Sequence, residues 1–299
     1  MTTYKYFIGI FATAMSLVSC SDGISLDEPK TADTKPEMQF SFIHPDDRQQ
    51  SRATETAFET GDKVGLFVNE TSHALEIGGN TVNNEMLTCN GRDWFSTETL
   101  YWDAGTYNAT AYYPYQDEIS SITDLPFSVR TDQTTPASDD NLSGYEASDF
   151  LYASAKNLTA TSSPVNLSFR HVMSKLTVRM IKGDNYEGEL PENATVYVHN
   201  TVPSATIDIE AGIVTKITRG AQQTITACKT GPTDYSAIIV PQRIENRVPL
   251  IEIVMEGVSF LFESKFQFKP GVHHIVNLVI EDNPDKIKIE IGGEITDWN

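Results

Sequence analysis

The feature that most constrains the fold is a two-residue alternation of apolar and polar side chains that recurs in short segments. The clearest segments are Met38–Phe42, Thr177–Met180, Thr195–His199, Ala205–Ile209 and Lys286–Ile291. Turn-forming sequences such as Gly91-Arg92-Asp93 and Lys269-Pro270-Gly271 separate segments of this kind. Successive side chains of a strand point to opposite faces, so this alternation is typical of half-buried strands. A helical period is almost absent, and the pattern predicts an all-β chain of antiparallel β-sandwiches.

The length of 299 residues is enough for two domains of ordinary size. We expect residues 37–168 to form an N-terminal β-sandwich and residues 169–299 to form a C-terminal one. The Ser- and Thr-rich stretch Asn157–Pro164 is the first candidate for the linker, and Gly183–Pro191 is the second. Each half is then long enough to bury a core of its own.

The N-terminus has the features of a lipoprotein signal. Lys5 precedes an apolar run from Phe7 to Val18, which is too short for a comfortable transmembrane helix. The run ends in Leu17-Val18-Ser19-Cys20, which is a lipobox. We therefore expect residues 1–19 to be a signal peptide and Cys20 to carry the lipid, which would anchor the protein firmly to a membrane. Residues 20–36 are acidic and contain prolines, and they predict a flexible tether.

The charge balance excludes some partners. The chain has 41 acidic and 22 basic residues and a net charge of −19. Such a chain repels nucleic acid and anionic lipid surfaces, so we expect no nucleic-acid binding and membrane contact through the lipid anchor only.

The sequence contains no local signature of catalysis, of a metal site or of a cofactor site. The six histidines are scattered, and the adjacent His273 and His274 would point to opposite faces of a strand. We expect neither an enzyme nor a bound metal or cofactor. One aromatic cluster has two readings, either core packing, which is favoured, or a platform for sugars. Its members are Trp94, Phe95, Tyr101, Trp102, Tyr107, Tyr112, Tyr113 and Tyr115.

The order of motifs carries a resemblance. After the lipobox and the tether come SRATETAFETGDKVGLFV (51–68), LYWDAGTYNATAYYPY (100–115), SDFLYASA (148–155), VNLSFRHVMSKLTVRM (165–180), YSAIIVPQ (235–242), FQFKPGVHHIVNLVI (266–280) and ITDW (295–298). This series resembles the fimbrillin-like family, which comprises lipoprotein pilins and fimbrial tip proteins (type V pili) of Bacteroidetes. The resemblance covers the chain from Cys20 to its end.

The resemblance implies two tandem transthyretin-like β-sandwich domains and a fimbrial protein exported to the cell surface as an outer-membrane lipoprotein. Subunits of this family that polymerise are cut after an arginine, lose their first strand and receive a donor strand from another pilin subunit. The matching cut here falls between Arg52 and Ala53. The displaceable strand would contain Met38, Phe40 and Phe42. The alternative is that Arg52 is an ordinary loop charge in a subunit that is never cut.

The resemblance also bears on position in the fibre. Stalk subunits carry C-terminal strands that serve as donors, whereas this sequence stops at Asn299, shortly after the strand-like Lys286–Ile291. We therefore expect a tip or anchor subunit. A second reading is a surface lipoprotein that captures a host or bacterial glycan or protein and does not polymerise.

Overall fold

The computed structural model describes residues 35–48, 57–139, 141–184, 186–281, 288–290 and 295–298. The predicted signal peptide, the lipid site Cys20 and the predicted cut between Arg52 and Ala53 lie outside these residues. Within the described part, no helix has the length and apolar character needed to cross a membrane.

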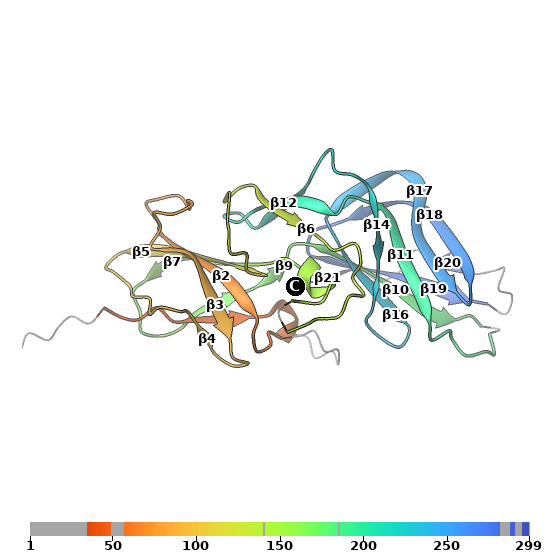
Figure 1. Cartoon of the computed structure of the whole chain (residues 1–299), viewed down its shortest axis with the longest axis horizontal. Helices are drawn as coiled ribbons and strands as arrows, with labels where there is room; N and C mark the ends of the chain where they lie inside the picture. Colours follow the sequence, from red (N-terminus) through yellow and green to blue (C-terminus); the bar gives the residue numbers. More distant parts are fainter. Residues whose placement is uncertain are drawn as a thin grey trace, which may run out of the picture. The chain divides into compact units, whose positions relative to one another are not determined.

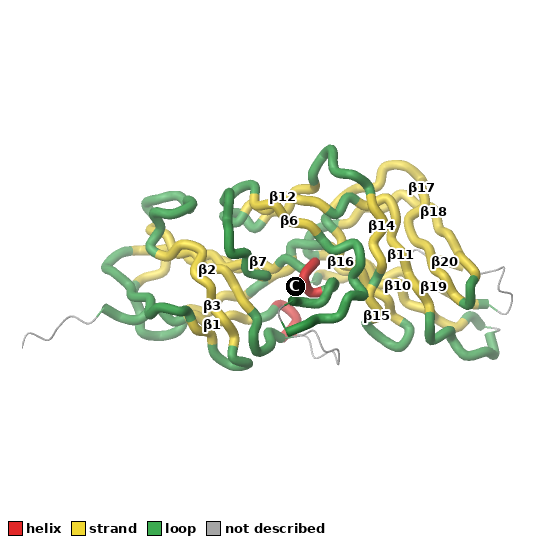
Figure 2. The backbone as a smooth tube through the Cα atoms, in the orientation of Figure 1, coloured by secondary structure: helices red, strands yellow, loops and turns green. Residues whose placement is uncertain are grey.

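The described chain is all-β, which confirms the predicted fold class. Figure 2 shows strands and loops throughout, with only short helical turns. These turns are the 3₁₀ helices η1 (Pro45–Arg48) and η2 (Glu146–Ser148). The described residues within Lys35–Asn299 belong to one compact unit.

The first sheet is antiparallel throughout and has six strands, several of which lie side by side in Figure 1. Its order is β4 (Trp94–Phe95), β3 (Val82–Cys89), β2 (Lys63–Glu70), β5 (Thr106–Tyr113), β7 (Leu151–Thr159) and β9 (Arg170–His171). A separate two-stranded sheet joins β1 (Phe40–Ile43) to β8 (Val165–Ser168) in parallel.

Three further sheets contain the remaining strands. A three-stranded sheet has the order β13 (Ile213–Lys216), β12 (Ser204–Asp208) and β6 (Leu125–Ser128). A four-stranded sheet has the order β14 (Gln223–Thr226), β11 (Ala194–Thr201), β17 (Gln242–Met255) and β18 (Val258–Phe268). A second six-stranded sheet contains β15 (Cys228–Lys229), β16 (Asp234–Ile239), β10 (Ser174–Lys182), β19 (Val272–Ile280), β20 (Lys288–Glu290) and β21 (Ile295–Asp297). Most pairs are antiparallel as predicted, but β10 and β19 pair in parallel, as do β1 and β8.

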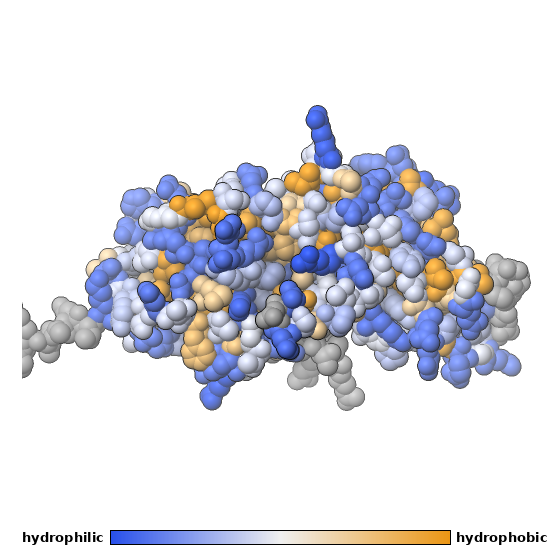
Figure 3. Space-filling model, viewed as in Figure 1, coloured by the Kyte–Doolittle hydropathy of each residue, from blue (hydrophilic) through white to orange (hydrophobic). Residues whose placement is uncertain are grey.

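Two hydrophobic cores fill the molecule. The first core contains buried residues between Met38 and Phe169, and the second core contains buried residues between Phe67 and Trp298. Strand β2 contributes to both, because Leu66 faces the first core and Phe67 faces the second. On the face shown in Figure 3, hydrophilic residues are spread between smaller hydrophobic patches.

A glycine in β2 permits close packing between the strands. A Cβ at Gly65 would overlap the ring of Tyr112, which is completely buried. The Tyr112 hydroxyl donates a hydrogen bond to Asn84 Oδ1 at 2.7 Å. Glycine is therefore required where the aromatic ring crosses the strand.

The expectation that Asn157–Pro164 is a linker is wrong at its N-terminal end. Strand β7 continues to Thr159, because Leu158 pairs with Tyr107 and packs against the first core. Two other features involve both predicted halves: β9 belongs to the first sheet, and β6 pairs with β12. The boundary near residue 168 stays a prediction.

Candidate functional site

The N-terminal segment, defined here as residues 35–48, lies against the first core through one strand. Its sequence FSFI forms β1, in which burial alternates along the strand as the apolar pattern predicts. Phe40 pairs with Val165 and Phe42 with Leu167, and among the described strands β1 has no hydrogen-bonded neighbour other than β8. The predicted strand Met38–Phe42 therefore exists, displaced toward its C-terminal end.

Three apolar side chains of the N-terminal segment pack into the first core. Met38, Phe40 and Phe42 are all buried. The Phe40 ring lies 6.2 Å from that of Trp102. The Phe42 ring contacts Trp94 edge-on, with the ring centroids 4.9 Å apart, and lies 5.7 Å from Phe169. Burial of three such side chains contributes roughly 5–9 kcal/mol.

Backbone contacts hold the segment on both sides of β1. The Trp102 amide donates a hydrogen bond to the Pro36 carbonyl at 2.9 Å, and the Met38 amide donates one to the Leu100 carbonyl at 2.8 Å. After the strand, the Phe169 amide donates one to the Ile43 carbonyl at 2.9 Å. The end of the predicted tether, Pro36, is thus already part of the folded body.

A buried histidine makes a further contact with the segment. His171, in β9, is 1% exposed. Its Nδ1 lies 2.8 Å from Asp149 Oδ2, and its Nε2 lies 3.4 Å from Asp46 Oδ2 in η1. The imidazole stacks on the indole of Trp298, with 3.7 Å between the ring centroids and 9° between the planes. We call these four residues the His171 cluster.

The cluster favours the charged forms of His171 and Asp46. Burial lowers the pKa of His171, but the carboxylates of Asp149 and Asp46 outweigh it and hold this pKa above its ordinary value. Burial raises the pKa of Asp46, but the hydrogen bond to His171 and its charge, together with His44 and Lys175, hold it below its ordinary value. Both side chains are therefore charged in the interval between their ordinary pKa values of 3.8 and 6.5.

Sequence reasoning missed this cluster. It treated His171 as one of six scattered histidines, because Asp46, Asp149 and Trp298 are distant from it in the sequence. A usable signal was the position of His171 in SFRHVMS, where a titratable side chain follows Phe169 in an apolar stretch. Such a residue requires a buried polar partner.

A cleft of about 760 Å³ adjoins the cluster. Asp46, Asp149, His171 and Trp298 line it, together with Ala57 and a ring of acidic and aromatic side chains. Asp46 and Ala57 precede and follow the sequence that contains Arg52 and Ala53. In the sequence, the predicted cut therefore falls between two residues, Asp46 and Ala57, that both line this cleft.

Half of the aromatic cluster belongs to the core, which confirms the favoured interpretation for those four members. Trp102, Tyr107, Tyr112 and Tyr113 are buried. Phe95 and Tyr101 are about half exposed, at 52% and 51%. Of the described tryptophans, Trp102 and Trp298 are buried and Trp94 is half-buried. Trp102 and Trp298 therefore offer no open face on which a sugar could stack.

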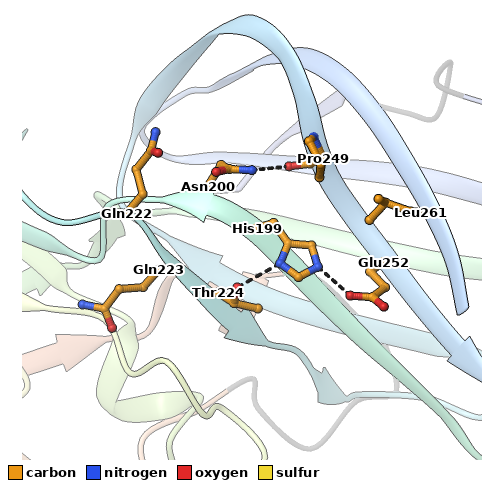
Figure 4. Close-up of a pocket in the computed structure, with 8 residues that line it drawn as sticks. All are labelled: His199, Asn200, Gln222, Gln223, Thr224, Pro249, Glu252 and Leu261. Carbon is orange, nitrogen blue, oxygen red and sulfur yellow. Dashed lines mark hydrogen bonds and ion pairs between the residues drawn. The ribbon is translucent and has the colours of Figure 1, made fainter.

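Another hollow, of about 330 Å³, lies on the four-stranded sheet (Figure 4). His199, on β11, has Nδ1 at 2.8 Å from Thr224 Oγ1 and Nε2 at 2.8 Å from Glu252 Oε2. Hydrogen bonds from Ser259 and His199 lower the pKa of Glu252. The other lining residues are Asn200, Gln222, Gln223, Pro249 and Leu261. The hollow thus combines fixed polar groups with the exposed apolar side chain of Leu261.

The adjacent histidines of β19 have separate surroundings. His273 Nε2 lies 2.7 Å from Thr177 Oγ1, and burial lowers the pKa of His273 to about 4. His274 packs against the rings of Phe266 and Phe268, at centroid distances of 5.2 and 6.1 Å. The described residues contain no group of three or more side chains placed to hold a metal ion.

Solved structures share this fold. A cell adhesion protein from Bacteroides ovatus aligns with a TM-score of 0.68 at 21% identity, over 89% of this chain and 98% of that chain. A second cell adhesion protein, from Bacteroides uniformis, aligns with a TM-score of 0.67 at 18% identity, over 90% of this chain and 99% of that chain. The C-terminally truncated tip fimbrial protein Mfa3 of Porphyromonas gingivalis aligns with a TM-score of 0.54 at 11% identity, over 88% of this chain and all of that one.

Sequence comparison gives the family. The Bacteroides ovatus protein called fimbrium tip subunit Fim1C is 32% identical over 146 residues. That match covers 46% of this chain and 26% of the relative, so the chain matches about a quarter of the relative's length. The family model described as fimbrillin-like matches residues 51–298, which confirms the resemblance read from the motifs. The chain belongs to the fimbrillin-like family.

Proposed function

We propose that this protein is a fimbrial subunit that is exported as an outer-membrane lipoprotein through Cys20 and is assembled by strand exchange with other pilin subunits. Membership of the fimbrillin-like family supports the fimbrial role. The lipobox at Leu17–Cys20 supports the anchor. A cut between Arg52 and Ala53 would separate residues 20–52, and with them β1, from the rest of the protein.

The observation that carries this proposal is the pairing of β1. The strand buries Phe40 and Phe42 in the first core, yet β8 is its one hydrogen-bonded neighbour among the described strands. It therefore lies where it can leave without dividing a sheet. The predicted cleavage site follows it in the sequence, so one cut would free it.

The energies explain why a partner strand would take its place. Loss of the buried side chains of the segment removes roughly 5–9 kcal/mol, whereas the whole stability of a domain is about 5–15 kcal/mol. The vacated groove would expose the edge of β8 and the rings of Trp94, Trp102 and Phe169. Unpaired backbone beside an apolar groove favours addition of a strand from another chain.

The proposal is tested by N-terminal sequencing of the protein recovered from surface fibres. We expect Ala53 at the N-terminus, loss of the cut and of polymer in Arg52→Ala, and normal assembly of the control Arg92→Ala, whose arginine is exposed in a turn. A polymer whose subunits still begin at Cys20 would refute exchange of β1. Such a subunit would fit an anchor position instead.

The hollow in Figure 4 favours a second candidate function, capture of a host or bacterial surface glycan. Its amides, its imidazole and Glu252 can donate and accept hydrogen bonds, as sugar hydroxyls require. A glycan array would test this role, with Glu252→Gln and Gln223→Ala expected to abolish any signal. A signal that both variants keep would exclude the hollow as the binding site.

A further inference from the structure

The His171 cluster joins three distant parts of the chain at one imidazole. Asp46 follows β1, Asp149 follows η2, and Trp298 follows β21. The histidine, Asp149 and Trp298 belong to the body of the protein, whereas Asp46 belongs to the N-terminal segment that the proposed cut would release. The body thus holds the segment by a charge in addition to the apolar sockets of the first core.

We propose that His171 selects the strand that fills the groove by binding a carboxylate carried four residues beyond the second groove-filling aromatic side chain. This inference rests on the proposed function. In the uncut chain the selected group is Asp46, four residues after Phe42. After exchange it is an aspartate or glutamate of the incoming strand of another subunit, at the same spacing.

The cleft as a whole has an acidic lining, but the charges of the body that act most strongly on the Asp46 position, His171 and Lys175, favour a carboxylate there. When the N-terminal segment leaves, Asp46 and His44 leave together, and of the two described carboxylates that pair with His171, that of Asp149 remains. Lys175 stays on β10, with its ammonium 5.4 Å from the centre of the Trp298 ring. An incoming strand therefore meets two cationic side chains, one of them buried. A buried charge that loses a partner is costly, so the groove favours a strand that restores the partner.

The charge of His171 would also disfavour strands that carry a positive side chain at the Asp46 position. Two bulky apolar residues at alternate positions occur in most strands of a β protein, so the sockets for Phe40 and Phe42 discriminate little. A strand with a lysine in place of Asp46 would face His171 and Lys175 with a like charge. Repulsion of this kind gives specificity that apolar contacts do not provide.

The test uses the mature chain cut with an arginine-specific protease and freed of its N-terminal segment. The probes are synthetic peptides of residues 37–48 in three forms: unchanged, with Asp46→Asn, and with Glu37→Gln. Glu37 is exposed and serves as the matched loss of one negative charge. Affinities are measured on the wild-type body and on the His171→Gln body.

On the wild-type body, we expect Asp46→Asn to weaken binding at least about tenfold, because it removes one charge of an ion pair whose other member is buried, and Glu37→Gln to weaken it less than about twofold. On the His171→Gln body, the difference between the unchanged and Asp46→Asn peptides should fall below about twofold, which is the mark of a direct coupling. Three outcomes would overturn the inference. All peptides could bind the wild-type body equally, or the unchanged peptide could fail to bind. The third outcome is an affinity difference between the unchanged and Asp46→Asn peptides that persists on the His171→Gln body.

A measurement on the uncut chain separates this inference from the proposed function. Asp46→Asn should speed hydrogen exchange of the β1 amides at least about tenfold relative to Glu37→Gln, with β10 amides unchanged. Fibres whose subunits keep Cys20 would refute the proposed strand exchange. The faster hydrogen exchange of the β1 amides in Asp46→Asn could still be observed in that case. Equal rates of hydrogen exchange in the two variants would show that the contact between Asp46 and His171 does not hold β1, even if Arg52 is cut.

Discussion

Strands β1 and β10 bury similar apolar side chains but are held in different ways. Phe42 in β1 is 7% exposed and Leu176 in β10 is 1% exposed. Strand β10 is hydrogen-bonded on one edge to β16 and on the other to β19, whereas β1 pairs with β8 alone among the described strands. The comparison teaches that similar burial can accompany different pairing, and under the proposed function we expect the number of paired edges, more than the depth of burial, to decide which strand can leave.

The largest expected effect is on β10. Leu176→Ala should lower the free energy of unfolding by about 2–5 kcal/mol, because it leaves a cavity in a strand that cannot open without the rest of its sheet. Urea unfolding followed by circular dichroism measures the loss. A cost below about 1 kcal/mol would contradict the central place assigned to β10.

A smaller effect on the whole molecule is expected in β1. Phe42→Ala removes a buried ring that is worth about 3 kcal/mol when a core is intact. The measured loss should be about 1–3 kcal/mol, because under the proposed function we expect the N-terminal segment to open while the body remains folded. Hydrogen exchange should show faster exchange of β1 amides than of β10 amides. Equal acceleration in the two strands would mean that β1 does not open alone.

The His171 cluster should make the stability of the N-terminal segment depend on pH. The pKa of His171 is raised above its ordinary value of 6.5, so its contribution is complete below that value and is lost as pH rises through the folded pKa. The pKa of Asp46 is lowered from 3.8, so its contribution is complete above that value and is lost as pH falls through the folded pKa. The pair therefore contributes most between these two ordinary values.

Comparison of wild type with His171→Gln tests this dependence. The difference in unfolding free energy should be about 1 kcal/mol near pH 6 and should shrink toward pH 9. Thermal unfolding at several pH values measures it, with Arg243→Ala as a control that should show no such trend. A difference that stays constant over this range would argue against a charged His171.

The smallest effect is expected at the start of the N-terminal segment. Lys35 forms an ion pair with Asp103 in which both side chains are more than half exposed. Solvent screens such pairs, so Lys35→Ala should change the unfolding free energy by less than about 0.5 kcal/mol. The same denaturation experiment measures it. A larger loss would mean that this contact, and not the aromatic sockets, holds the segment.

Much of the fold could be predicted from the sequence because alternation reports burial on one face. It identified the strand that contains Phe40 and Phe42 and much of β10 and β11. It could not identify β8 as the neighbour of β1, because strand partners distant in sequence leave no local pattern. The linker was misplaced for a related reason: a Ser- and Thr-rich stretch resembles a loop until Leu158 is seen against the first core.

The site divides in the same way. The apolar part, Met38, Phe40 and Phe42, follows from the periodicity of one segment. The charged part does not, because Asp46, Asp149 and His171 meet only after β9 has joined the first sheet. Core packing could be favoured for the aromatic cluster because large aromatic side chains commonly pack across strands, but the sequence did not separate the four buried members from the exposed Phe95 and Tyr101.

The parallel direction of β1 and β8 has a mechanical consequence. Strands that run the same way cannot be joined by a tight hairpin, so all of the first sheet up to β7 intervenes between these two in the chain. Strand β1 is therefore attached to its neighbour by reversible contacts and by no short covalent loop. If the backbone is cut downstream of β1 as proposed, we expect β1 to leave, and an incoming strand to take its place beside β8, without any tight hairpin of the first sheet having to open.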